Sequence, residues 1–330
     1  MYFVLLHYKS ILKMSKILLY SLFTCLLLIS CTKEVEIDIA GFEEQVVVEG
    51  RIETDGFPIL LLSRSQNVYA ATNIGSYLQS FISDATVSVN NGQQTIQLEP
   101  ISISQLPLSS QKTVAEMLKL ELYEVVFLPI LVYSTANASV KGEAGKTYTL
   151  EINYKGKTFD GETSILNPVP LDTVYWMPNS ENIEYGLSVG RLSDPKNEYN
   201  AYKWEAKRIN IQSNGEELDT LFRKGGSGYF DDKFFNGITL EFEASNRQRR
   251  KDPTHLAEYK RYYRLGDSVV VKFSRIDKQS FDFFNKMDAQ LNSAGNPFAT
   301  PVNVPSNISG GALGIWCGIS PWYDTLYCIP

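Results

Sequence analysis

The stretch KTYTLEINYKGKTFDGET, residues 146–163, decides the fold class of this chain of 330 residues. Lys146–Tyr154 alternates polar and apolar side chains, a pattern typical of a strand with one buried face. Gly156 then turns the chain into a second strand, Lys157–Thr163. The stretch therefore predicts a β-hairpin.

Runs of β-favouring residues extend this prediction toward the N-terminus. Three of them are Gln45–Glu53 (QVVVEGRIE), Phe57–Ser63 and Ala85–Asn90. Asn91-Gly92 is a strong hairpin turn and leads from the last of these into Thr95–Leu98. Because short strands separated by turns are typical of a β-sandwich, residues 45–167 are predicted to form one, Ig-like or transthyretin-like in type.

A helical insertion near residues 101–135 interrupts the predicted sandwich. Gln111–Val126 has apolar residues near helical spacing, after Ser109 and Ser110 as candidate caps. The apolar run Val125–Val132 follows it. Two interpretations stay open: the insertion packs on the sandwich, or its apolar residues form an exposed surface that binds a partner.

The segment Asn167-Pro168-Val169-Pro170 predicts a linker, because two prolines disfavour continued pairing in a sheet. Beyond it, three runs have the composition of strands: Tyr202–Ile211, Ile238–Phe242 and Ser268–Phe273. Ile276–Leu291 places apolar residues on one face of a helix that Asp277 or Ser280 would cap. Residues 168–330 are therefore predicted to form a second β-rich domain with one or two helices.

The N-terminal residues predict a signal peptide over 1–30. They carry three lysines and no acid, followed by an apolar run over 17–29. That run is shorter than the roughly 20 residues of a membrane-spanning helix and fits the core of a secretory signal. It ends in Leu28-Ile29-Ser30-Cys31, which resembles the lipobox of bacterial lipoproteins. We therefore predict lipidation of Cys31, with acyl chains such as palmitate, and a tether over 31–44.

Composition narrows the classes of function. Loss of the signal peptide removes three lysines, so the net charge of −6 becomes −9, which disfavours binding to nucleic acid. Of the two histidines only His255 remains, and this excludes metal sites built on a histidine pair. No phosphate-loop or dinucleotide-binding motif occurs. We predict no cofactor, no metal and no enzymatic activity; a glycosidase with two carboxylates is the less favoured alternative.

Two cysteines remain in the mature chain besides the lipidated one. Cys317 and Cys328 are predicted to form a disulfide, because the chain is expected to leave the reducing cytosol. Gly318 and Pro321 lie between them and favour a reversal of the chain.

The C-terminal segment also gathers aromatic residues. Trp322, Tyr323 and Tyr327 are candidate binding residues, since aromatic rings stack on sugars and anchor protein interfaces. The alternative is that Trp322 and Tyr323 fill the core, and it stays open. Trp316 lies in an alternating run and is predicted to be a core residue.

Seven short segments occur in an informative order: Val46–Ile52, Ala85–Val89, Gly145–Leu150, Asp194–Tyr202, Gly266-Asp267, Asn296-Pro297-Phe298 and Pro305–Gly314. Together with the lipobox they resemble the Bacteroidota lipoproteins that carry the domain of unknown function 4249. The helical insertion departs from this pattern. The resemblance implies an outer-membrane lipoprotein, often encoded near TonB-dependent transporters, and it supplies no catalytic residue.

These features predict a lipid-anchored outer-membrane protein that faces the periplasm or the cell surface. The expected role is that of a non-catalytic accessory or ligand-capturing partner of a TonB-dependent β-barrel, with a glycan or a peptide as the captured ligand. A surface adhesin or structural lipoprotein is the alternative that the same features allow.

Overall fold

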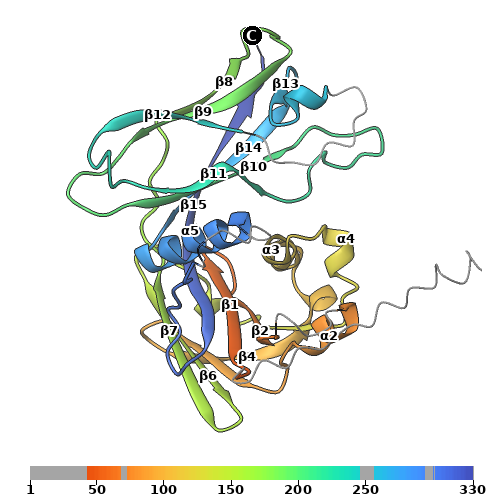
Figure 1. Cartoon of the computed structure of the whole chain (residues 1–330), viewed down its shortest axis with the longest axis vertical. Coiled ribbons are helices and arrows are strands. Elements are labelled where there is room, and N and C mark those ends of the chain that lie inside the picture. Colours follow the sequence, from red (N-terminus) through yellow and green to blue (C-terminus); the bar gives the residue numbers. More distant parts are fainter. Residues whose placement is uncertain (1–42, 68–72, 246–255, 294–299, 301, 330) are drawn as a thin grey trace, which may run out of the picture. The chain divides into compact units, whose positions relative to one another are not determined.

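The computed structural model describes residues 43–67, 73–245, 256–293, 300 and 302–329 (Figure 1). The predicted signal peptide, Cys31, most of the tether, His255 and Asn296-Pro297-Phe298 lie outside these residues. Within them the fold is mainly β, which confirms the predicted fold class. In this part of the chain no helix is long and apolar enough to cross a membrane.

Two sheets contain the labelled strands of the described residues. The larger contains β1 (Val46–Glu53), β2 (Ile59–Arg64), β3 (Thr86–Asn90), β4 (Thr95–Ser102), β5 (Leu131–Ser134), β6 (Thr147–Tyr154), β7 (Lys157–Ser164), β10 (Ala201–Arg208), β11 (Arg223–Asp231), β14 (Ser268–Ile276) and β15 (Leu313–Tyr327). The smaller contains β8 (Thr173–Pro178), β9 (Tyr185–Ser193), β12 (Thr239–Ala244) and β13 (Tyr263–Arg264). The larger sheet has the order β11-β10-β14-β15-β1-β2-β5-β4-β3-β6-β7, and β9 lies between β12 and β13 in the smaller.

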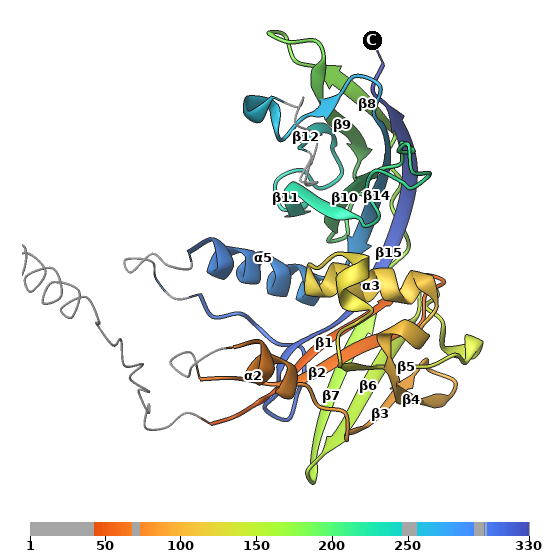
Figure 2. The ribbon, with the colours of Figure 1, turned by 90° about the vertical axis from the view of Figure 1, so that its right-hand side faces the viewer.

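The C-terminal strand β15 joins the two halves of the larger sheet. It pairs in parallel with β1, with Trp316 opposite Gly50, and antiparallel with β14, with Tyr323 opposite Lys272. Figures 1 and 2 show this single strand passing from the strands around β14 to those around β1. The division into domains at residues 167 and 168 stays a prediction.

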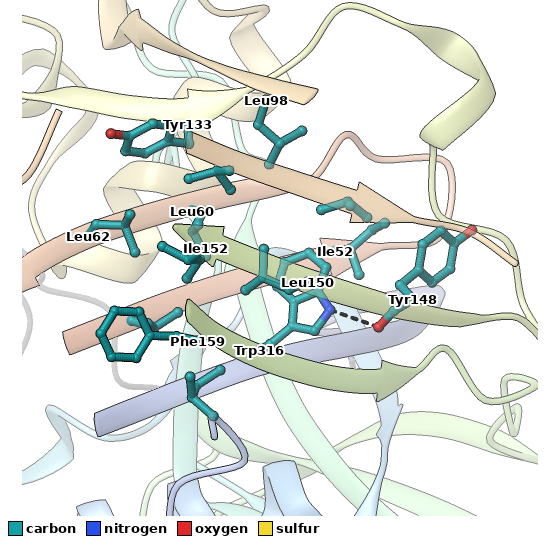
Figure 3. Close-up of a cluster of buried hydrophobic side chains, with 14 of the residues drawn as sticks. Ile52, Leu60, Leu62, Leu98, Tyr133, Tyr148, Leu150, Ile152, Phe159 and Trp316 are labelled. Atoms are coloured by element: carbon teal, nitrogen blue, oxygen red, sulfur yellow. Dashed lines mark hydrogen bonds between the residues drawn. The ribbon is translucent and has the colours of Figure 1, made fainter. Parts of the chain in front are cut away.

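The first half of the sheet curves around a core centred on Trp316 (Figure 3). The indole is fully buried, and its Nε1 donates a hydrogen bond to the backbone oxygen of Tyr148 over 3.0 Å. The backbone N–H of Gly318 on β15 donates to Thr163 Oγ1 on β7 over 2.7 Å. The layers facing each other across this core are therefore parts of one curved sheet, and Trp316 is confirmed as a core residue.

The insertion packs on the outer face of the sheet. It contains a 3₁₀ turn at Ile103–Gln105, the helix α3 (Leu108–Leu118) and the short helix α4 (Leu122–Val125). Its buried side chains form one cluster with Ile59 and Leu61 of β2, which confirms packing on the sheet. The single helix predicted from Gln111 to Val126 is wrong, because the chain adopts a left-handed conformation at Lys119, where φ is 57°. Pro107, not a serine, occupies the N-cap position.

The other helices in the described part of the chain are α2 (Ile74–Gln79) and α5 (Lys278–Ser293), with 3₁₀ turns at Ala138–Val140 and Ala257–Tyr259. The predicted cap of α5 is confirmed, since Asp277 Oδ1 accepts a hydrogen bond of 2.7 Å from the backbone N–H of Ser280. α5 packs against β10 and β15, and α3 lies next to it in both views (Figures 1 and 2).

Candidate functional site

The three C-terminal aromatic residues lie on one strand and point to different faces. Because side chains alternate along a strand, Trp322 faces opposite to Tyr323 and Tyr327. Trp322 packs against the aromatic core between the two sheets, beside Phe273 of β14. Tyr323 and Tyr327 expose 50% and 59% of their surfaces, so these two remain available to a partner.

The predicted Cys317–Cys328 disulfide is wrong, since the structure contains no bond between these two residues. Cys317 lies near the start of the 15-residue strand β15 and Cys328 directly follows its end. At about 3.3 Å per residue they are on the order of 30 Å apart, whereas a disulfide needs Cα atoms within about 7 Å. Gly318 and Pro321 do not reverse the chain, because both pair within the extended strand.

Charged side chains are buried on the face of the larger sheet against which α5 packs and which Glu116 of α3 reaches. This charged cluster contains Arg51, Glu53, Glu116, Lys203, Glu205 and Lys272. Glu116 comes from α3, and the others come from β1, β10 and β14. On β10 the cause is visible in the sequence YKWEA: aromatic residues face one side, and Lys203 and Glu205 face the other, yet both sides are buried.

Short contacts join the members of the cluster. Lys272 Nζ lies 2.8 Å from Glu53 Oε2, and Arg51 Nη1 lies 3.3 Å from Glu116 Oε2. Lys203 Nζ lies 2.7 Å from Glu205 Oε1. Glu205 Oε2 has no hydrogen-bond partner among the described residues, although Lys272 is its neighbour across the sheet. Three cations and three carboxylates thus balance one another with little access to solvent, and Glu53 is the most exposed of them, with 16% of its side chain exposed.

Burial and neighbouring charges shift the pKa values of Glu205 and Glu116 in opposite directions. Burial alone raises the pKa of Glu205, but the attraction of Lys203, Lys272 and Arg51 outweighs burial and lowers that pKa to about 2. For Glu116 burial dominates, so its pKa lies above the ordinary value although Lys272 and Arg51 oppose the shift. Glu205 is therefore held as a carboxylate, and Glu116 is the weaker acid of the two.

Such a cluster has two chemical interpretations. Carboxyl groups with separated pKa values are a pattern of acid and base catalysis. A buried ion network can instead fix how elements pack, because breaking it leaves uncompensated charge. The contacts favour the second, since Glu116 is the member on α3 and also accepts a hydrogen bond of 3.2 Å from the backbone N–H of Phe222. The network therefore ties the insertion and the segment before β11 to the sheet.

An aromatic surface borders this cluster. The rings of Phe222 and Tyr323 have centroids 5.9 Å apart, and the Nζ atoms of Lys207 and Lys272 each lie 5.6 Å from the Phe222 ring. We call Lys207, Phe222, Tyr323 and Tyr327 the Tyr323 surface. Its two tyrosine rings are exposed, whereas Lys207 is largely covered and lies 2.6 Å from Glu217 Oε2. The tyrosines can therefore bind a partner through stacking and hydrogen bonds.

The tyrosines of this surface were predicted from the sequence, but the charged cluster was not. The signal was present, since lysine and glutamate alternate with aromatic residues on β10. Such alternation normally marks one face in solvent. Only the tertiary structure shows that α5 packs against β10 on that face.

The family model described as Domain of unknown function (DUF4249) matches residues 32–320. No curated protein matches the chain.

Proposed function

This chain belongs to the family of the domain of unknown function 4249, and we propose that it is a non-catalytic lipoprotein that partners a TonB-dependent transporter of the outer membrane. In this proposal Cys31 carries the lipid, and the folded part works next to the membrane as an accessory or ligand-capturing protein. The captured ligand is a glycan or a peptide. The lipobox-like sequence before Cys31 supports the anchor, and the family match supports the relationship to proteins with this organisation.

The observation that carries the binding role is the exposure of Tyr323 and Tyr327 on an otherwise well-buried strand. On the opposite face of β15, Trp322 packs in the aromatic core. Lys272, which lies opposite Tyr323 on β14, is buried in the charged cluster. The two exposed rings therefore rest on a rigid base. Tyrosine at such positions loses little conformational freedom on binding and is a frequent hot spot of protein interfaces.

The binding role is tested by purification from detergent-solubilised outer membrane. We expect an outer-membrane β-barrel to co-purify with the unaltered chain. We expect at least a tenfold weaker association in the double variant Tyr323→Ala, Tyr327→Ala, since hot-spot residues contribute about 2 kcal/mol or more. The matched control is Tyr123→Ala, which removes a tyrosine 64% exposed on α4.

Three outcomes would contradict the proposal. One is the absence of any co-purifying barrel. Another is equal recovery of the barrel with the double variant and with the control. The third is binding to host or matrix polymers without a barrel partner, which would favour a surface adhesin or structural lipoprotein.

The anchor is tested by Cys31→Ala. We expect the altered chain to be almost absent from the membrane fraction, because the lipid on this thiol is the proposed membrane anchor. Two or more acyl chains are needed for stable anchoring. Cell fractionation with detergent extraction measures this. Cys317→Ala is the matched control and should leave the distribution unchanged, since that thiol is buried. Membrane association that persists in Cys31→Ala, without a lipidated partner, would refute the anchor.

A further inference from the structure

The short helix α2 lies beside the point where the predicted tether joins the fold. The backbone N–H of Gln45 donates a hydrogen bond of 2.9 Å to Ser65 Oγ, and the backbone N–H of Ser65 donates one of 2.8 Å to the oxygen of Gln45. The next residue, Gln66, donates from Nε2 over 2.9 Å to the backbone oxygen of Ser76 on α2. Figures 1 and 2 show α2 next to β2. The start of β1 and α2 therefore belong to one end of the fold.

Large apolar side chains at this end are exposed. On α2, Ile74 is 81% exposed and Tyr77 is 44% exposed. Leu313 lies opposite Val47 on the other side of β1 and is 41% exposed. We call Ile74, Tyr77 and Leu313 the tether-side surface. Leu78 packs against the buried cluster of the insertion, so α2 is held on the sheet while its neighbours on the helix stay in contact with solvent.

The predicted tether sets how far this surface lies from the membrane. Residues 31–43 span at most about 40 Å when fully extended, and on the order of 20 Å as a flexible chain. Because the lipid on Cys31 is the proposed anchor, the bilayer stays within this reach of the end that carries α2. Such tethering gives a high effective concentration of the bilayer, so a weak apolar contact is sufficient for docking.

We propose that the tether-side surface docks on the bilayer that holds Cys31, with Ile74 inserted among the acyl chains and Tyr77 at the level of the head groups. Tyrosine favours this level, because its ring is apolar and its hydroxyl is polar. Glu43 and Glu44 are exposed at the same end, so lipids without net charge are favoured over anionic ones. The inference rests on the proposed anchor and adds to it the orientation of the folded part.

The test measures the contact between α2 and lipid. Gln79→Cys places a thiol at an exposed position of α2, and an environment-sensitive fluorophore labels it, since Cys317 and Cys328 are buried. The lipidated full chain is reconstituted in phosphatidylcholine vesicles, and quenching by nitroxide-bearing lipids is measured. We expect at least about threefold stronger quenching than for a label at Glu181→Cys, because a docked helix lies within about 10 Å of the acyl chains.

A substitution assigns the contact to Ile74. Ile74→Asp should reduce the quenching at Gln79→Cys by about fivefold or more, because a carboxylate does not enter the acyl chains. Ile183→Asp is the matched control and should leave the quenching unchanged, since Ile183 is 70% exposed on the loop between β8 and β9. Raising the salt concentration from about 0.05 to 0.5 M should also leave it unchanged, because screening acts on charges and not on apolar contacts. Circular dichroism melting shows whether each variant is folded.

A second arrangement separates docking from the anchor. A hexahistidine tag in place of Cys31 holds the same tether on a nickel-chelating lipid. If the native chain carries no lipid, the proposed anchor is wrong, and the tagged chain still tests the docking. If the chain is held on vesicles in either way and the labels at Gln79→Cys and Glu181→Cys are quenched equally, the docking is wrong and the anchor is unaffected.

Three other results would overturn the docking. One is unchanged quenching in Ile74→Asp. Another is quenching that occurs only on vesicles with anionic lipid, which would show electrostatic adsorption. The third is blue-shifted emission of the label at Gln79→Cys without vesicles that does not change when vesicles are added, which would assign the tether itself as the occupant of α2.

Discussion

Trp316→Ala is expected to lower the free energy of unfolding by about 3–5 kcal/mol, the usual cost of removing a buried tryptophan. The indole is fully buried and donates a hydrogen bond to Tyr148. The cavity should persist, because the backbone of Gly50 lies against the ring: a Cβ there would be 2.5 Å from Trp316 Cε3. A glycine has no side chain that could move in to fill the space.

Urea unfolding followed by circular dichroism measures this change. Tyr327→Ala removes an exposed aromatic residue from the same strand and is the matched control, with an expected change within about 0.5 kcal/mol. Equal effects of the two substitutions would contradict the view that β15 contributes the centre of the core around β1.

Lys272→Met is expected to cost about 3–5 kcal/mol of stability, because it leaves buried carboxylates with one cation fewer. Lys272 is 3% exposed, and its Nζ lies 2.8 Å from Glu53 and close to Glu205 across the sheet. Lys278→Met is the control, since Lys278 pairs with Asp282 on the exposed face of α5 and such pairs contribute about 0.5 kcal/mol. A cost below about 1 kcal/mol for Lys272→Met would show that the cluster does not hold the sheet and α3 together.

The same variant should change how stability depends on pH. In the folded protein the pKa of Glu205 is lowered to about 2 from the ordinary 4.5. The folded state therefore stabilises the ionised form of Glu205 more than the unfolded state does. Its contribution to stability is therefore complete above about pH 4.5 and is lost as the pH falls toward 2. Removing Lys272 brings this pKa closer to its ordinary value, so the loss of stability on acidification should become shallower. Urea unfolding at a series of pH values measures the slope, and an unchanged slope would contradict the assignment.

Local sequence signals were sufficient for elements whose hydrogen bonds are made by neighbouring residues. The hairpin of β6 and β7 follows from alternation and Gly156, and that of β3 and β4 follows from Asn91-Gly92. The capped helix α5 was found in the same way. The break between α3 and α4 was missed, because nothing in the spacing of apolar residues marks Lys119 as the end of a helix.

The sequence by itself determined that this chain is mainly β and that Trp316 is a core residue, because each follows from local periodicity. It left open how the insertion packs, and the tertiary structure decided that it packs on the sheet.

Only the tertiary structure decided the course of β15. This strand pairs with β1, although the two strands lie near opposite ends of the sequence. Together with the pairing to β14, this pairing keeps the strand extended and separates Cys317 from Cys328. The pairing with β14 places Trp322 against the aromatic core and leaves Tyr323 exposed. The charged cluster arises because α5 packs against a face of β10 that the sequence alone presents as polar, and because α3 brings Glu116 to Arg51 of β1. The physical reason is that burial depends on which distant segment packs on a face.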